Sequence, residues 1–214
     1  MRKVFQQELR EVQERLVEIA ELVEIAIKQA TTAFATSDVV LAEQVIDDGE
    51  QIDQLAKALD ELTIDILARQ QPVASDLRLM VGSLRMSSSL ERMADLAQHI
   101  AQLSRYRYPE SAIPQGLRKT FAKMGEIDVE MAAKLVSLLR EQDQAVIDEI
   151  RDLDDALDEL HAKVFEKVLT EKVQASGPTG VVDATLASRY HERFGDHAVN
   201  ITKQMNFFLS GELE

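Results

Sequence analysis

The feature that most constrains the fold is a stripe of apolar residues spaced alternately by three and four positions. The first stripe consists of Phe5, Leu9, Val12, Leu16, Ile19, Val23, Ala26 and Ala30. The second consists of Leu117, Phe121, Met124, Ile127, Met131, Leu135 and Leu138. Such a stripe covers one side of an α-helix and is buried against partner helices. With only 4 prolines and 8 glycines in 214 residues, the chain has too few turn residues for an all-β fold.

Breaks in the pattern divide the chain into six long helices. We expect them at about residues 2–34, 38–69, 75–106, 117–141, 145–173 and 182–209. Asp38 and Ser75 are predicted helix caps, and residues 176–180 are predicted to form a loop. Helices of about 30 residues are rods about 45 Å long. Short connections between such rods predict antiparallel neighbours.

The second half of the chain repeats the first. Residues 91–95 read Glu-Arg-Met-Ala-Asp and residues 192–196 read Glu-Arg-Phe-Gly-Asp, an offset of 101 positions (192 − 91). The same offset relates Val-Ile-Asp-Asp at 45–48 to Val-Ile-Asp-Glu at 146–149. Repeated sequence predicts repeated structure. We therefore predict an all-α protein of two tandem three-helix bundles, residues 1–108 and 109–214, or one six-helix bundle built from them.

Charge and composition exclude several classes of function. The 38 acidic and 24 basic residues give a formal charge of −14, which disfavours binding to nucleic acid and to anionic lipid. The absence of cysteine excludes thiol catalysis and cysteine-ligated metals. The sequence has no apolar signal-peptide core and no run of about 18 apolar residues. We expect a cytoplasmic protein without membrane insertion.

Acidic pairs recur inside the repeated motif. Glu91 and Asp95, like Glu192 and Asp196, lie four residues apart on one helix face, beside the apolar stripe. Partial burial of such like charges is unfavourable unless a cation is present. The neighbouring helices can add further carboxylates, with no basic residue obviously among them: Asp53 in the first unit, and Asp154 and Asp158 in the second. Oxygen ligands of this kind suit magnesium, calcium, manganese or iron.

A solvated helix face is the alternative interpretation, because pairs such as Glu14 with Glu18 are common in an acidic chain. Repetition of the pair within a matched motif favours metal binding. The Asp158–His161 spacing is similar to one half of a di-iron motif, but it occurs once, and we interpret it as surface chemistry. The sequence shows no phosphate-binding glycine loop and no nucleophile–base pair. These features favour a regulator over an enzyme, with a di-metal carboxylate enzyme and a metal-free helical adaptor as alternatives.

The sequence Arg-Gln-Gln-Pro-Val-Ala-Ser-Asp-Leu-Arg at 69–78, followed by Leu-Glu-Arg-Met-Ala-Asp at 90–95, resembles the PhoU family of phosphate-signalling regulators. The segment Glu-Arg-Phe-Gly-Asp-His-Ala-Val-Asn-Ile at 192–201 is similar to the Glu-Arg-Ile-Gly-Asp signature of that family. The resemblance covers nearly the whole chain, including its length and its duplicated three-helix plan.

The resemblance implies a cytoplasmic negative regulator of the phosphate-starvation response, controlling phosphate uptake and homeostasis. Its implied partners are the sensor histidine kinase of that pathway and the ATPase subunit of the phosphate ABC transporter, and a homodimer is expected. It also implies metal clusters, with iron or zinc in some family members; manganese and magnesium are candidates from the oxygen ligands alone. The ligands carried over by position are Asp53, Glu91, Asp95, Asp154, Asp158, Glu192 and Asp196.

Two positions depart from the family pattern in the first unit. Gly49 stands where an acid is expected four residues before Asp53, with Asp48 and Glu50 as possible substitutes. Ala94 replaces the usual glycine of the signature. Unless Asp48 or Glu50 substitutes, the resemblance therefore supports the first-unit metal site less well than the second.

Overall fold

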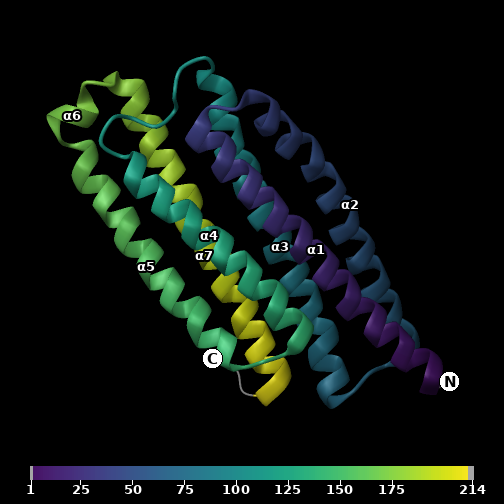
Figure 1. Ribbon diagram of the computed structural model, residues 1–214. Helices are drawn as coiled ribbons and strands as arrows, with labels where there is room; N and C mark the ends of the chain where they lie inside the picture. The colour runs from purple at the N-terminus through teal and green to yellow at the C-terminus, as the bar shows by residue number, and fades with distance from the viewer. Residues whose placement is uncertain (1, 212–214) are drawn as a thin grey trace.

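The computed structural model describes residues 2–211. Within them, α-helices are the only regular secondary structure, and short turns and loops connect them. The helices are α1 (Arg2–Thr36), α2 (Val39–Gln70), α3 (Ala74–Arg107), α4 (Arg118–Glu141), α5 (Ala145–Val168), α6 (Glu171–Gln174) and α7 (Gly177–Ser210). Six of them are long and lie side by side in an elongated molecule (Figure 1). This confirms the prediction of an all-α fold of tandem helical bundles. Within residues 2–211, no helix combines the length and the apolar character needed to cross a membrane.

The two predicted apolar stripes form the core. All residues of both stripes are buried except Phe5, which is partly buried and packs against the others. Helices α1, α2 and α3 pack together as one three-helix unit, and α4, α5 and α7 form the second. The units also pack against each other, because α3 lies along α7 and α1 lies along α4. One continuous core results. The boundary between residues 108 and 109 stays a prediction.

Of the two predicted helix caps, one is confirmed and one is wrong. Asp38 caps α2 as predicted, since its carboxylate accepts hydrogen bonds from the backbone N–H of Val40 and Leu41. Ser75 does not cap α3. That helix begins at Ala74, its N-cap is Val73 in an extended conformation, and no side chain closes it.

The largest error lies near the predicted loop at residues 176–180. The predicted fifth helix ends early, at Val168, and a four-residue helix α6 follows. Helix α7 then begins at Gly177, with Pro178 in its first turn, rather than at Val182. Proline is favoured in the first turn of a helix because the N–H that it lacks has no helical partner there. The Ser-Gly-Pro sequence was therefore a helix start rather than a loop.

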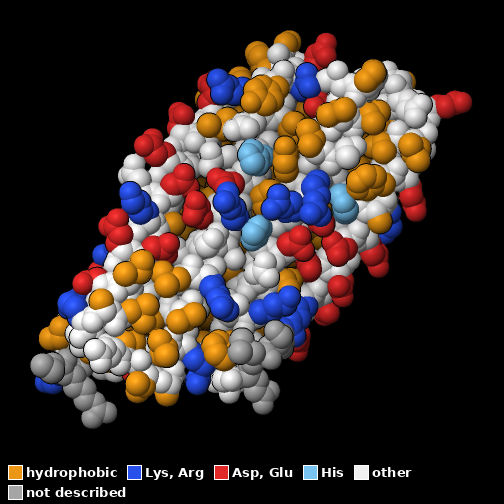
Figure 2. Space-filling model, turned by 180° about the vertical axis from the view of Figure 1, so that it is seen from behind, with side chains coloured by type: hydrophobic (Ala, Val, Ile, Leu, Met, Phe, Trp, Pro, Cys, Tyr) orange, Lys and Arg blue, Asp and Glu red, His pale blue; other side chains and the backbone are white. Residues whose placement is uncertain are grey.

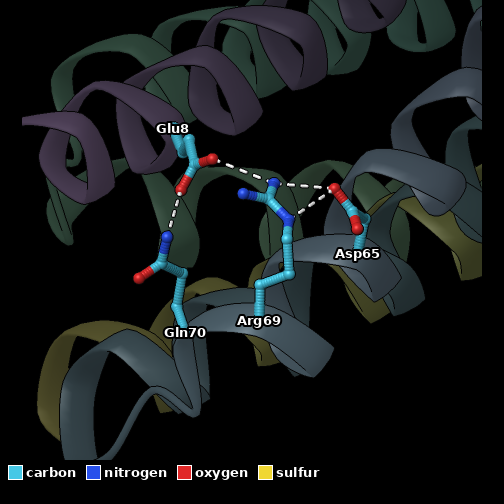
Figure 3. A network of polar contacts seen from close by, with 4 residues as sticks. All are labelled: Glu8, Asp65, Arg69 and Gln70. Atoms are coloured by element: carbon cyan, nitrogen blue, oxygen red, sulfur yellow. Dashed lines mark hydrogen bonds and ion pairs between the residues drawn. The ribbon is translucent and has the colours of Figure 1, made fainter. Parts of the chain in front are cut away.

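Polar contacts between distant segments hold the helices in register. Figure 3 shows Arg69, near the end of α2, between Glu8 of α1 and Asp65 of its own helix. Gln70 donates to the second oxygen of Glu8 at 3.2 Å. Between the units, the Arg107 guanidinium at the end of α3 donates to both carboxylate oxygens of the buried Asp183 on α7. These contacts complement the core packing between the same helices.

Candidate functional site

Helices α5 and α7 bring four predicted carboxylates together as the second acidic cluster, which we define as Asp154, Asp158, Glu192 and Asp196. The pKa of Asp154 is raised to about 7, chiefly by burial and then by the charges of Asp158, Asp196, Asp155 and Glu192, in that order. Burial also raises the pKa of Glu192, followed by the charge of Asp196. The four side chains are therefore within electrostatic reach of one another.

Two oxygens of this cluster are buried and lack a hydrogen-bond partner among the described residues. They are Oδ1 of Asp154 and Oε2 of Glu192. Buried polar atoms are normally paired, since an unpaired one costs about 1–3 kcal/mol. The Oε1 atom of Glu192 is paired, because it accepts a hydrogen bond from Arg189 one turn earlier on α7. The unpaired oxygens and the raised pKa values describe a site that either a bound proton or a bound cation would stabilise.

Gly195 allows α5 to approach α7 at this cluster. A Cβ at this position would overlap with Oδ1 of Asp154 and would lie 3.0 Å from Cδ2 of Leu157. The glycine of the repeated motif thus has a spatial role, since it makes room for the Asp154 carboxylate against the backbone of α7.

Helices α2 and α3 assemble the first acidic cluster, defined as Asp53, Glu91 and Asp95. Burial raises the pKa of Glu91, and the charges of Asp53 and Asp95 add to this effect. The pKa of Asp53 is raised by burial, then by Asp95 and Glu50, while Arg92 opposes the shift. Asp48 and Glu50 could each replace the acid that is missing at Gly49. Of these two, Glu50 lies close enough for its charge to raise the pKa of Asp53.

The first cluster contains fewer acids than the second, and one of them is more exposed than its counterpart. The counterpart of Asp158 is Lys57, since 158 − 101 = 57, so a basic residue replaces an acid. Ala94 occupies the position of Gly195, and Asp53 is exposed, whereas its counterpart Asp154 is partly buried. The Gln98 side chain fills the space where a Cβ of Gly49 would lie. The first cluster therefore offers fewer candidate metal ligands than the second.

The expectation that no basic residue stands among the carboxylates was wrong. Arg92 donates to Asp95 at 2.9 Å in the first cluster, and Arg189 pairs with Glu192 in the second. Each arginine is three residues before its partner on the same helix, where a long side chain reaches the next turn. Within residues 2–211, no group of three His, Asp or Glu side chains is already arranged to hold a metal ion.

Sequence reasoning missed a second matched pair beside each cluster. In the second unit, Nδ1 of His161 lies 2.6 Å from Oγ of Ser188. In the first unit, burial raises the pKa of Asp60, and a hydrogen bond between Asp60 and Ser87 partly offsets this rise. Both pairs obey the offset of 101 positions, so the repeat could have revealed them. The charge of His161 reaches Glu192, which places this histidine beside the cluster and not in unrelated surface chemistry.

His197 connects the surroundings of the two clusters. Its pKa is lowered by burial and by Arg193 and Arg92, while Asp196 and Asp95 act in the opposite direction. Its Nδ1 atom is buried and has no partner among the described residues. Figure 2 shows one face of the molecule on which two groups of acidic side chains are separated by basic and histidine side chains. Packing of α3 against α7 therefore brings both acidic motifs to one region.

Comparison with known proteins gives the family. The PhoU domain model matches twice, at residues 16–104 and 121–205. The phosphate-specific transport system accessory protein PhoU homolog 2 of Mycobacterium tuberculosis is 39% identical over 211 residues, covering 99% of both chains. PhoU homolog 1 of Mycobacterium leprae is also 39% identical, over 99% of this chain and 95% of its own length.

The solved structures agree with the sequence relatives. PhoU from Pseudomonas aeruginosa superposes with a TM-score of 0.90 at 27% identity, over 97% of this chain and 100% of its own. The regulatory protein PhoU from Streptococcus pneumoniae shares the fold, with a TM-score of 0.87 at 23% identity, over 98% of this chain and 99% of its own. With both halves matched by the domain model and the full length matched by relatives, this chain belongs to the PhoU family.

Proposed function

We propose that this protein is a regulatory accessory of phosphate-specific transport and not an enzyme. The observation that carries this proposal is the 39% identity, over 99% of both chains, to a phosphate-specific transport system accessory protein. In this proposal the protein contacts the ATPase subunit of a phosphate ABC transporter and a sensor histidine kinase. It represses the phosphate-starvation response while phosphate is plentiful, and it acts in the cytoplasm as a homodimer.

We further propose that the acidic clusters bind metal ions, with the second cluster binding more tightly. The two unpaired buried oxygens of Asp154 and Glu192 support this, because a cation would satisfy both atoms. All-oxygen ligands favour hard cations such as manganese, magnesium or iron, and the nearby His161 would also suit zinc. Bound metal would offset the repulsion between carboxylates on α5 and α7 and would fix the relative position of the two helices.

A metal-free helical adaptor is the second candidate function. The ion pairs of Arg92 with Asp95 and of Arg189 with Glu192 favour it, because they already neutralise part of each cluster. Under this alternative, the acidic side chains would serve as a docking surface, and removing their charge would leave the structure intact.

The regulatory role is tested in a bacterial strain that lacks its own PhoU gene and carries a phosphate-starvation reporter. Expression of this chain should restore repression in high phosphate. Purified protein should retain the transporter ATPase subunit and the cytoplasmic part of the kinase in a binding assay. An unrepressed reporter, together with no binding to either partner, would contradict the proposed function.

The metal proposal is tested by elemental analysis of protein purified without chelator or a metal-affinity tag. The parent should contain stoichiometric metal, and the Asp154→Asn/Glu192→Gln variant should lose most of it. The matched Asp53→Asn/Glu91→Gln variant, altered in the first cluster, should lose less. If the parent holds no metal after incubation with manganese, iron or zinc and still binds its partners, the adaptor is correct.

A further inference from the structure

A hollow of about 490 Å³ is lined by residues from the start of α4, the end of α5 and the short helix α6. Figure 1 shows these three segments at one end of the molecule. We call this cavity the basic hollow, and its lining residues are Gln115, Gly116, Arg118, Lys119, Lys167 and Lys172. Four of these six residues carry a positive charge, and none of them is acidic. This is the reverse of the overall charge of −14.

Three separate segments contribute these cations. Arg118 and Lys119 begin α4, Lys167 is in the last turn of α5, and Lys172 belongs to α6. The Lys172 stem lies over the backbone of Gly116, where an added Cβ would be 3.3 Å from Cδ. The Lys167 ammonium donates to Oγ1 of Thr120 at 2.7 Å. Tertiary packing, and not sequence proximity, gathers the four charges.

The cations of the basic hollow are not neutralised by acidic side chains of the described residues. No ion pair joins Arg118, Lys119, Lys167 or Lys172 to any residue within the described range 2–211, although other basic side chains, such as Lys134, are paired. Like charges that share one hollow repel each other within the Debye length, which is about 8 Å at physiological salt. Three of the four side chains are exposed, so solvent reduces this repulsion, and an anion bound among them would reduce it further.

The start of α4 adds to this local positive potential. No side chain caps the helix at Leu117, and its first turn contains no acid. The positive end of a helix dipole favours acidic residues, yet α4 begins with two basic ones. The Leu117 N–H donates to the Pro114 carbonyl at 3.2 Å, and no side chain in the described range accepts from the first turn of α4, which lies beside the four cationic side chains.

We propose that the basic hollow binds a small soluble phosphoryl anion with several negative charges, of the inorganic polyphosphate class. Lysine and arginine form strong charge-assisted hydrogen bonds with phosphate oxygens. The net negative charge of the rest of the chain repels extended polyanions and anionic lipid surfaces, so a small ligand fits better than a nucleic acid or a membrane. The overall charge argues against direct phosphate sensing, but the fold separates positive from negative charge. This site goes beyond the proposed regulatory role and does not depend on it.

The experiment is calorimetric titration of the full, metal-free chain with sodium tripolyphosphate at about 0.15 M salt. One saturable site per chain is expected, with an affinity that falls as salt rises. The Lys119→Ala/Lys172→Ala variant should bind at least about tenfold more weakly, because two charge-assisted contacts are lost. The Lys3→Ala/Lys203→Ala variant removes the same charge from exposed positions elsewhere and should retain the parent's affinity to within about twofold. Circular dichroism verifies that both variants fold.

Three results would overturn the proposal. They are no saturable binding of tripolyphosphate, equal weakening in both double variants, and binding of phosphatidylglycerol vesicles without binding of tripolyphosphate. None of these results bears on reporter repression or on binding to the transporter ATPase subunit. Failure of the anion site is therefore distinguishable from failure of the proposed function.

Discussion

Replacing Asp154 with asparagine should stabilise the metal-free protein above pH 7. The carboxyl of Asp154 has a pKa of about 7 in the folded protein, against 3.8 as its ordinary value. The folded state therefore holds the proton more tightly than the unfolded state between these values. By linkage, the contribution of this group is greatest below pH 3.8 and is lost as pH rises through 7. Asparagine has nearly the same shape and cannot ionise, so it avoids this loss.

The magnitude follows from the same two pKa values. At about 1.4 kcal/mol per pH unit, the difference between 3.8 and about 7 corresponds to at most about 4 kcal/mol of destabilisation at high pH. Because the side chain is only partly buried, solvent screens much of this energy. We expect the variant to gain about 1–2 kcal/mol in unfolding free energy at pH 8, and close to nothing at pH 4.

Urea denaturation with chelator at pH 4, 6 and 8 measures this gain. The matched control is Asp53→Asn, the same change at the equivalent position of the first unit. Its gain should be smaller, because Asp53 is exposed. With manganese added at saturation, the parent should become more stable than Asp154→Asn, since only the parent keeps that ligand. A variant that is destabilised at pH 8 in chelator, or whose gain does not change with pH, would refute the assignment of Asp154 as a strained carboxylate.

Three further changes probe the packing around the site. Gly195→Ala should displace the carboxylate opposite it and weaken metal binding in a competition titration, although alanine is the better helix former by about 1 kcal/mol; unchanged metal affinity would contradict the role given to this glycine. His191→Phe should lower the free energy of unfolding, measured by heat or urea, by about 3–5 kcal/mol. The reason is that the fully buried Asp128 would lose its ion-pair partner, His191. The double variant Asp128→Leu/His191→Phe should recover most of that loss, and a double variant as unstable as the single one would exclude this explanation. Asp38→Ala should lower stability by about 1 kcal/mol through loss of the α2 cap, and an unchanged urea midpoint would show that the cap is dispensable.

The sequence contained most of the fold because helix periodicity is a local signal. Residues three and four apart must share a face, so the stripes of α1 and α4 predicted both the helices and their buried sides. The error near Ser176 arose because Gly-Pro marks turns and helix starts alike. Whether it ends one element or begins another depends on what packs beside it. The separate helix α6 had no periodic signal, because four residues make little more than one turn.

Part of the candidate site was also visible in the repeat: Asp53 with Asp154, Glu91 with Glu192 and Asp95 with Asp196 obey the offset of 101 positions, whereas Asp158 has no acidic counterpart. Two contacts could be seen only in the structure: the ion pair of Arg92 with Asp95, and the close approach of Asp154 to Gly195. Side-chain conformation and the distance between helices are not encoded in the spacing of apolar residues. The same holds for His197, whose surroundings come from two helices that are distant in sequence.

By itself, the sequence determined the helices, their duplication and the faces that carry acidic residues, since all three depend on spacing along one chain. Only the tertiary structure decided how charge is distributed in space. It buried one Asp154 oxygen, because Gly195 has no Cβ to exclude that carboxylate, and it left the equivalent Asp53 exposed. It also gathered Arg118, Lys119, Lys167 and Lys172 around one hollow in a strongly acidic chain. Net charge is a sum over residues, whereas binding depends on which charges the packing places together.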